Sequence, residues 1–355
     1  MRGLTRTRDA DRDRLKELPP PTDPPRMTIT VGTGPGGRRR LALAAATAAT
    51  LLLGTGTGTA AASATAQPTC HAAFPGDPGA GHLLLGAAGS QLSADEQATG
   101  RKLAHRIYFN KGISDFAVPN GPIARAILAE QAAGRIPVVS AKPGIAATAS
   151  GQYDGTLRAF FAWADALPKV SFVIVHHEPE NDAVGKSAAV RHQLAADFRA
   201  AQRHVRAALN AATGGHPRHV SFGGSLMTYT LTAQGAARLA PIDEFFPGKG
   251  VWDWAAWDQY DPNPARPLED QKWKDALAKS KQWGLPAAVT ELGVRPSDPQ
   301  GAAKLSAFYA HALAAGVPFV LYFDSPADKG WVMGDRLRTT WRALVTDPRT
   351  VTPNA

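Results

Sequence analysis

The chain has 355 residues and a single cysteine, Cys70, which excludes an intrachain disulfide framework and any metal site built from several cysteines. Its formal net charge is +9. Residues 1–66 hold 10 basic and 5 acidic side chains. The remaining 29 basic and 25 acidic residues are too balanced to indicate a nucleic-acid partner or an anionic membrane.

The first 66 residues have the pattern of an export signal. Residues 1–37 are rich in charge, Pro and Gly, so we expect them to be disordered. Arg38–Arg40 form a basic region, Leu41–Leu53 form an apolar stretch too short to span a bilayer, and Ala66 ends a small-x-small cleavage site. We therefore predict a signal peptide at 38–66, used by the Sec or the Tat pathway. After its cleavage the protein should be secreted and not associated with a membrane.

From residue 82 onward, short apolar runs alternate with segments of helical spacing. Helices are predicted in five of the intervals, at Pro122–Ala133, Tyr153–Leu167, Ser187 to Ala212, Glu269–Trp283 and Pro299–Ala315. The apolar runs predict eight strands, at His82–Ala88, Arg106–Asn110, Ile136–Ala141, Phe172–Val175, His219–Leu226, Trp252–Tyr260, Ala287–Glu291 and Phe319–Asp324.

Eight buried strands separated by helices over about 260 residues match the size of a (β/α)8 TIM barrel, an α/β fold. A doubly wound open sheet is the alternative, but the first strand–helix turn lacks its G-x-G-x-x-G fingerprint. We predict one domain after the signal peptide. Its parts are a disordered extension (1–37), the signal peptide (38–66), a short linker (67–81), the catalytic barrel (82–345) and a C-terminal tail (346–355).

Two predicted strands end in carboxylates. The run Phe172–Val175 stops abruptly at His176, His177 and Glu178, and a second run closes on Glu291. Active sites of parallel α/β folds lie at this end of the strands, and cleavage of a glycosidic bond requires two carboxylates. Strict alternation would place His177 and Glu178 on opposite faces, but strand ends often bulge, so both stay candidates.

The sequence here resembles clan A of the glycoside hydrolases. The resemblance is carried by His177-Glu178-Pro179 with Asn181, and by Thr-Glu-Leu-Gly at 290–293. Histidine before the first glutamate is typical of the family 26 mannanase and glucanase group, whose motif is His-Glu-x-Asn-Gly. This chain has one extra residue before Asn181 and lacks the following Gly.

Two further segments bear on the resemblance. Trp257-Asp258-Gln259-Tyr260 resembles the strand-six Asp-x-Tyr segment of family 26, and Arg106 matches the strand-two Arg of the clan. The usual Trp of strand eight is missing, because Phe323 and Asp324 stand there instead.

The resemblance implies a retaining hydrolase of β-linked polysaccharide or oligosaccharide, with mannan, glucan and xylan as possible substrates. It implies that Glu178 is the general acid and base, that Glu291 is the nucleophile, and that neither a cofactor nor a metal is needed. We expect a monomer. The residues expected to bind substrate are His177, Asn181, Glu180, Trp257, Asp258, Tyr260, Asp324, Trp331 and Arg106.

Three alternatives remain open from the sequence. A barrel could have kept a carbohydrate-binding groove and lost turnover. Glu180, two residues further along the loop, is the rival acid. A metal-dependent hydrolase could use His176, His177, Glu178, Glu180 and Asp182, although adjacent histidines on one strand point to opposite faces.

Overall fold

The computed structural model describes residues 73–89, 91–261, 265–325 and 330–352. The predicted extension at 1–37, the signal peptide at 38–66 and Cys70 lie outside the described residues. Within the described part of the chain, no helix is long and apolar enough to cross a membrane.

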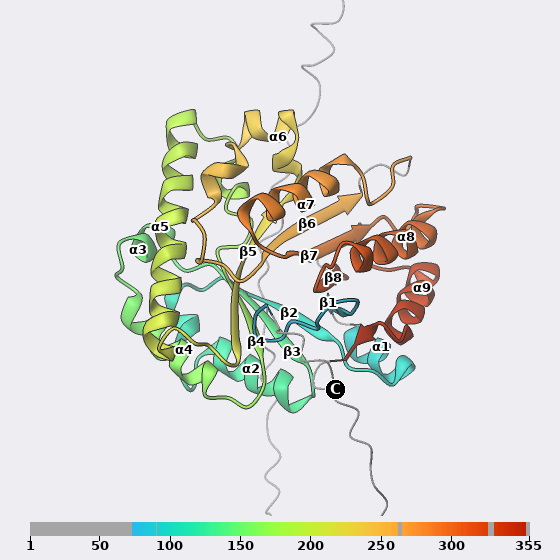
Figure 1. Ribbon diagram of the computed structural model, residues 1–355, viewed down its shortest axis with the longest axis horizontal. Coiled ribbons are helices and arrows are strands. Elements are labelled where there is room, and N and C mark those ends of the chain that lie inside the picture. The colour runs from blue at the N-terminus through green and yellow to red at the C-terminus, as the bar shows by residue number, and fades with distance from the viewer. Residues whose placement is uncertain (1–72, 90, 262–264, 326–329, 353–355) are drawn as a thin grey trace, which may run out of the picture. The chain divides into compact units, whose positions relative to one another are not determined.

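A closed ring of eight parallel strands forms the centre of the domain, and helices surround it (Figure 1). The strands are neighbours in chain order, and β1 pairs with both β8 and β2 to close the ring. The predicted TIM barrel is confirmed. Its strands are β1 (Leu83–Ala88), β2 (Ala104–Phe109), β3 (Ile136–Ala141), β4 (Ser171–Val175), β5 (Val220–Met227), β6 (Ala255–Asp261), β7 (Ala287–Val294) and β8 (Phe319–Phe323).

The longer helices follow the sequence pattern closely. Ser187 caps α5 by accepting a hydrogen bond from the Val190 amide, and Gly284 ends α7 in a left-handed conformation. The α-helices are α1 (Leu92–Thr99), α2 (Pro122–Ala132), α3 (Ile145–Ala149), α4 (Asp154–Asp165), α5 (Ala188–Thr213), α6 (Ala233–Arg238), α7 (Gln271–Trp283), α8 (Gly301–Ala314) and α9 (Asp335–Thr346). Short 3-10 turns occur at η1 (Ile113–Phe116), η2 (Asn181–Ala183), η3 (Thr228–Leu231) and η4 (Ile242–Phe245).

The sixth strand begins three residues later than predicted. Trp252 lies before it, and its Nε1 donates to Gln202 Oε1 of α5 at 2.9 Å, outside the barrel. Trp254 is fully buried in the barrel interior, where its Nε1 donates to Ser221 Oγ at 2.8 Å. These two rings are therefore packing residues, and regular strand pairing starts only at Ala255.

The barrel interior is filled by side chains from alternate strand positions, as the two-residue period requires. Phe74, which precedes the first strand, packs edge-on against Phe172 at 6.1 Å between ring centroids. A two-residue strand, β9 (Thr350–Val351), pairs with the start of β1. The interior residues are Leu84, Ala104, Ile136, Val138, Phe172, Ile174, Trp254, Ala256, Ala288, Phe319 and Leu321.

Above this apolar layer, toward the carboxyl ends of the strands, the buried residues become polar. Arg106, Ser140, Ser225, Asp258 and Thr290 are each at most 3% exposed. Arg106, Ser140, Asp258 and Thr290 each lie two residues after an interior residue of their strand, and Ser225 lies two residues after Gly223, which adjoins the interior Trp254 ring. The same periodicity that packs the core therefore delivers them to the barrel mouth.

Two glycines of β5 make room for the tryptophans before β6. A Cβ added to Gly223 would lie 2.2 Å from the Trp254 ring, too close for any real contact. We predict that Gly223→Ala lowers the free energy of unfolding by about 1–3 kcal/mol, because the core would be overpacked. Urea denaturation measures the change.

The matched control is Gly155→Ala in α4, where an added Cβ meets nothing within 4 Å. That substitution should stabilise the protein by about 0.5–1 kcal/mol, since alanine favours a helix. Equal effects of the two substitutions would contradict the close contact between Gly223 and Trp254.

Candidate active site

The chain turns sharply at the end of β4 and thereby directs two consecutive side chains into the barrel mouth. His176 and Glu178 both adopt positive φ angles, of 60° and 45°. Ile174 faces the interior, so strict alternation would next direct His176 inward. Instead His177 reaches the β3 side chain of Ser140, with 2.7 Å between Nδ1 and Oγ. The left-handed backbone at these positions is what allows His177 and Glu178 to share one face.

A bulge in β7 directs the Glu291 side chain into the barrel mouth. Trp257 of β6 is paired with Val289, but the next residue, Asp258, is paired with Glu291, so Thr290 is an extra residue. Thr290 Oγ1 donates to Asp258 Oδ1 at 2.7 Å inside the barrel. The bulge therefore turns both Thr290 and Glu291 toward the interior, which regular alternation forbids.

These strand ends bring three carboxyl groups together. Glu178, Asp258 and Glu291 each contribute one oxygen to a set whose members lie within 4.8 Å of one another. Asp258 and Glu291 are buried, whereas Glu178 is partly exposed. The two glutamates predicted as catalytic are thus neighbours, although they come from β4 and β7.

Arg106 supplies the positive charge for this cluster. Its side chain is fully buried, and one guanidinium nitrogen lies 3.1 Å from Glu291 Oε1 and 3.4 Å from Asp258 Oδ1. A second nitrogen donates to Ser225 Oγ at 3.4 Å. Because an unpaired buried charge is costly, Arg106 is the group that allows carboxylates to be ionised here.

Two tyrosines complete the hydrogen bonds of Glu291. Tyr108 donates to Oε1 at 2.7 Å, and Tyr260 donates to Oε2. Burial raises the pKa of both phenols well above the usual value, so they remain donors. With two donors and a guanidinium around it, the Glu291 carboxylate is held in one orientation with its negative charge stabilised.

Glu178 is in a different electrostatic environment. Burial, followed by the negative charge of Glu291, raises the pKa of Glu178 to about 8. Burial and Glu291 also raise the pKa of Asp258. Burial lowers the pKa of His177, so its imidazole is neutral. One glutamate that holds a proton beside another that is surrounded by donors is the division of roles expected of an acid and a nucleophile.

The carboxyl cluster does not fit a metal centre well. Both oxygens of Glu291 already accept hydrogen bonds from tyrosines, and Arg106 provides the compensating charge. The larger predicted metal set is also dispersed. His177 contacts Ser140, and Asp182 is an exposed residue that pairs with Lys142 at 3.1 Å.

The structure brings together most of the predicted binding residues. Arg106, Asp258 and Tyr260 line the carboxyl cluster through the contacts given above, and the His177 ring lies edge-on to that of Tyr108, with 5.5 Å between ring centroids. Asn181 lies at its rim, where Nδ2 is 3.5 Å from Glu178 Oε2.

Trp331 lies beside the cluster. Its ring centroid is 4.7 Å from that of Tyr260, and the Arg295 guanidinium lies over its ring at 3.8 Å.

Three predictions require correction. Trp257 is fully buried on the outer face of β6, where its Nε1 donates to Ser280 Oγ of α7, because Asp258 and Tyr260 take the inner face. Asp324 has both oxygens engaged, by Arg338 and by the Met333 amide, and holds α9 to β8.

Glu180 is 0% exposed, so it cannot meet a sugar or act as the acid. All three residues therefore lie outside the substrate-binding set.

Several partners of the carboxylates were not among the predicted site residues. Tyr108 could have been found, because it lies two residues after Arg106 and therefore shares its face of β2. Ser140 and Ser225 could have been noticed as polar residues inside apolar strands. Thr290 could have been found as the residue two positions after interior Ala288, but strict alternation gives no sign of the bulge that turns Glu291 inward.

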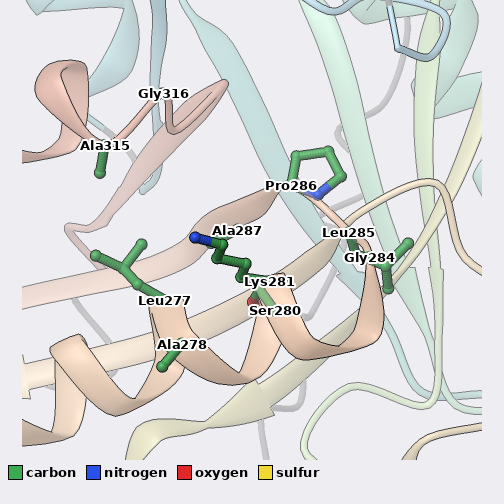
Figure 2. Close-up of a pocket in the computed structure, with 10 residues that line it drawn as sticks. All are labelled: Leu277, Ala278, Ser280, Lys281, Gly284, Leu285, Pro286, Ala287, Ala315 and Gly316. Atoms are coloured by element: carbon green, nitrogen blue, oxygen red, sulfur yellow. The ribbon is translucent and has the colours of Figure 1, made fainter.

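A cavity of the described chain lies away from this cluster. Its volume is about 460 Å³, and it is lined by the end of α7, the start of β7 and the turn after α8, including Lys281, Pro286 and Gly316 (Figure 2). Pro286 immediately precedes β7, so the cavity is at the opposite end of that strand from Glu291. Its position gives it no part in the chemistry of the glutamates.

Comparison with known proteins gives structural similarity only. No protein-family model and no curated protein sequence matches the chain. A Bacillus subtilis mannanase is 12% identical with a TM-score of 0.53, over 78% of this chain and 88% of the other. A GH26 β-mannanase from Bacteroides ovatus is 11% identical with a TM-score of 0.50, over 77% and 91%.

A third similar structure carries a sugar. It is a β-mannanase from a symbiotic protist of the termite Reticulitermes speratus, complexed with gluco-manno-oligosaccharide, and is 10% identical with a TM-score of 0.51 over 77% of this chain and 89% of the other. At such identities the similarity establishes the fold alone. The similar structures include members of the family whose motifs the sequence resembles.

We predict that Arg106→Met lowers the free energy of unfolding by about 3–5 kcal/mol at neutral pH, because it leaves buried carboxylates without a cation. The loss should be smaller at pH 4, where protonation removes the uncompensated charge. Urea denaturation at both pH values measures it.

Arg349→Met is the matched control, because Arg349 also pairs with a carboxylate, Asp347, but on the surface. It should change stability little. A destabilisation by Arg106→Met that does not depend on pH would contradict a charge-compensating role.

Proposed function

We propose that the protein is a secreted retaining glycoside hydrolase that cleaves β-linked polysaccharide or oligosaccharide by double displacement. One observation supports this most directly. Oxygens of Glu178 and Glu291 lie within 4.8 Å of each other, which suits the roughly 5–5.5 Å between the carboxyl groups of retaining enzymes. Inverting enzymes need about 6.5–9.5 Å, because a water molecule must fit between sugar and base.

In the first step, the Glu291 carboxylate attacks the anomeric carbon while Glu178 gives its proton to the departing glycosidic oxygen. The C–O bond to the leaving sugar breaks, and a glycosyl ester forms on Glu291. In the second step, Glu178, now ionised, removes a proton from water. The water oxygen attacks the anomeric carbon, and Glu291 leaves as a carboxylate.

The surrounding charges favour both steps. The negative charge of Glu291 is one cause of the raised pKa of Glu178, so Glu178 holds a proton before the first step. Ester formation removes that charge, which lowers the pKa of Glu178 just when a base is required. Arg106, Tyr108 and Tyr260 stabilise the carboxylate that leaves in the second step.

The substrate class follows from the rim and the similar structures. Trp331 and Tyr260 offer partly exposed aromatic surface next to the carboxyl cluster, on which sugar rings can stack. Two similar structures are described as β-mannanases, and one of them binds a gluco-manno-oligosaccharide. We therefore infer β-mannan as the first substrate to test, with β-glucan and xylan as alternatives. Secretion rests on the predicted signal peptide, and N-terminal sequencing of exported protein at Gln67 tests it.

The mature chain should hydrolyse at least one of three polymers, β-mannan, β-glucan and xylan. Glu291→Ala should abolish this activity, and Glu178→Ala should reduce it by about 10²–10⁴-fold, because general acid catalysis is lost. Reducing-sugar release measures the rates.

Asp165→Ala is a control, because Asp165 is a buried carboxylate at the other end of the barrel. Activity that survives in both glutamate variants would place the chemistry elsewhere. Binding of one polymer without hydrolysis would identify a non-catalytic carbohydrate-binding barrel.

The pH dependence should follow Glu178. Its carboxyl must be protonated in the first step, and its pKa is about 8, so kcat/KM should be retained below this value and fall as pH rises through it. The Glu178→Ala variant, assayed on an aryl glycoside whose leaving group needs no proton, should lack the fall. A basic limb that persists in this variant would assign the titration to another group.

A further inference from the structure

Glu180 is the most completely buried carboxyl group near the site, and its environment is unusual. It is 0% exposed, and Oε2 has no hydrogen-bond partner in the described structure. Other buried acids in the barrel pair with cations, as Asp95 does with Arg338 and Asp298 with Lys304. Within the described residues, Glu180 has no Lys, Arg or His partner. Its burial therefore needs a different explanation.

The contacts that Glu180 does make tie two loops together. Oε1 accepts a hydrogen bond of 2.6 Å from the backbone amide of Met227, the last residue of β5. Thr230 Oγ1 in η3 lies 3.4 Å from the same oxygen. Glu180 itself lies in the loop between β4 and α5, two residues after Glu178. The carboxyl group therefore connects the loop after β4 to the end of β5 through hydrogen bonds.

Glu178, the proposed acid, lies between β4 and the hydrogen bond from Met227 to Glu180. The Glu178 amide donates to the Ser225 carbonyl of β5 at 2.9 Å, and the Asn181 amide donates to the Glu178 carbonyl at 3.0 Å. Glu178 also has a φ of 45°, which is unfavourable for a residue with a side chain. Such a conformation persists only where neighbouring contacts impose it. The Glu180–Met227 bond is one of those contacts.

We propose that Glu180 is a positioning residue, and that its carboxyl group fixes the backbone of Glu178 against β5 so that the Glu178 carboxyl reaches the glycosidic oxygen. This role rests on the proposed glycosidase function. Burial raises the pKa of Glu180 to about 8, so the group is un-ionised at neutral pH and acts through its hydrogen bond rather than through charge. A glutamine has the same shape and the same acceptor oxygen.

The test compares two substrates that differ in their need for an acid. An oligosaccharide requires a proton on its leaving oxygen, whereas a dinitrophenyl β-glycoside does not. Glu180→Ala should lower kcat on the oligosaccharide by about 10²-fold, as loss of a general acid does, and change kcat on the aryl glycoside much less. KM should change little. Glu180→Gln should retain both rates and the basic limb of the pH profile.

Asp165→Ala is the matched control. Asp165 also accepts backbone N–H groups, of Arg218 and His219, each at 2.7 Å, but at the amino-terminal end of the strands. Its loss should leave the ratio of the two rates unchanged. If Glu180→Ala does not fold, Glu180→Asp replaces it, because the shorter side chain withdraws from Met227 while the acid is kept.

The outcomes separate the two proposals. A selective loss on the oligosaccharide in Glu180→Ala or Glu180→Asp, with activity retained in Glu180→Gln, supports positioning. Equal losses on both substrates, or no loss, overturn this role while the glycosidase proposal stands. A shifted basic limb in Glu180→Gln also overturns it, because it would show that Glu180 acts through its charge. A wild-type protein inactive on both substrates overturns the glycosidase function and this role together.

Discussion

The site depends on one buried interaction, the guanidinium of Arg106 between the carboxyl groups of Asp258 and Glu291. The three side chains come from β2, β6 and β7 and are almost completely excluded from water. Two acids in such a place would otherwise both be protonated, because desolvation favours the neutral form. A single permanent cation beside Glu291, with raised pKa values at Glu178 and Asp258, favours the proposed role of Glu291 as the nucleophile. The division of roles between the glutamates therefore starts from Arg106.

A second constraint is the geometry of the strand ends. The barrel core requires side chains to alternate strictly between interior and helix layer, and the active site requires consecutive residues to face inward. The chain satisfies both by breaking the period only at the mouth. Positive φ angles at His176 and Glu178 follow β4, and the extra residue Thr290 interrupts β7. Below these points the period is intact, so the irregularities needed for chemistry do not disturb core packing.

These two constraints explain what could be predicted from the sequence. Alternation of apolar runs and helices was sufficient for the barrel, and carboxylates at the ends of two buried strands indicated that Glu178 and Glu291 are neighbours at its mouth. Trp257 was wrongly assigned to the site. Asp258 and Tyr260 lie on the inner face of β6, so alternation places Trp257 on the outer face, but the sequence alone does not show which face is the inner one. The partner of Asp324 lies on α9, which the sequence pattern did not predict, so its structural role was hidden. Contacts between distant segments, such as Glu180 with Met227, have no local signal.

Double displacement requires that Glu291 form a covalent bond to the sugar. Incubation of the mature protein with 2-deoxy-2-fluoro β-glycosyl fluorides of mannose, glucose and xylose, followed by peptide mass spectrometry, tests this directly. The fluorine slows both steps, and the good leaving group restores the first, so a glycosyl ester accumulates. One labelled peptide that contains Glu291 is expected, with labelling absent in Glu291→Ala. A label on any other carboxylate, or turnover by an active enzyme that releases the inverted anomer without labelling, would contradict it.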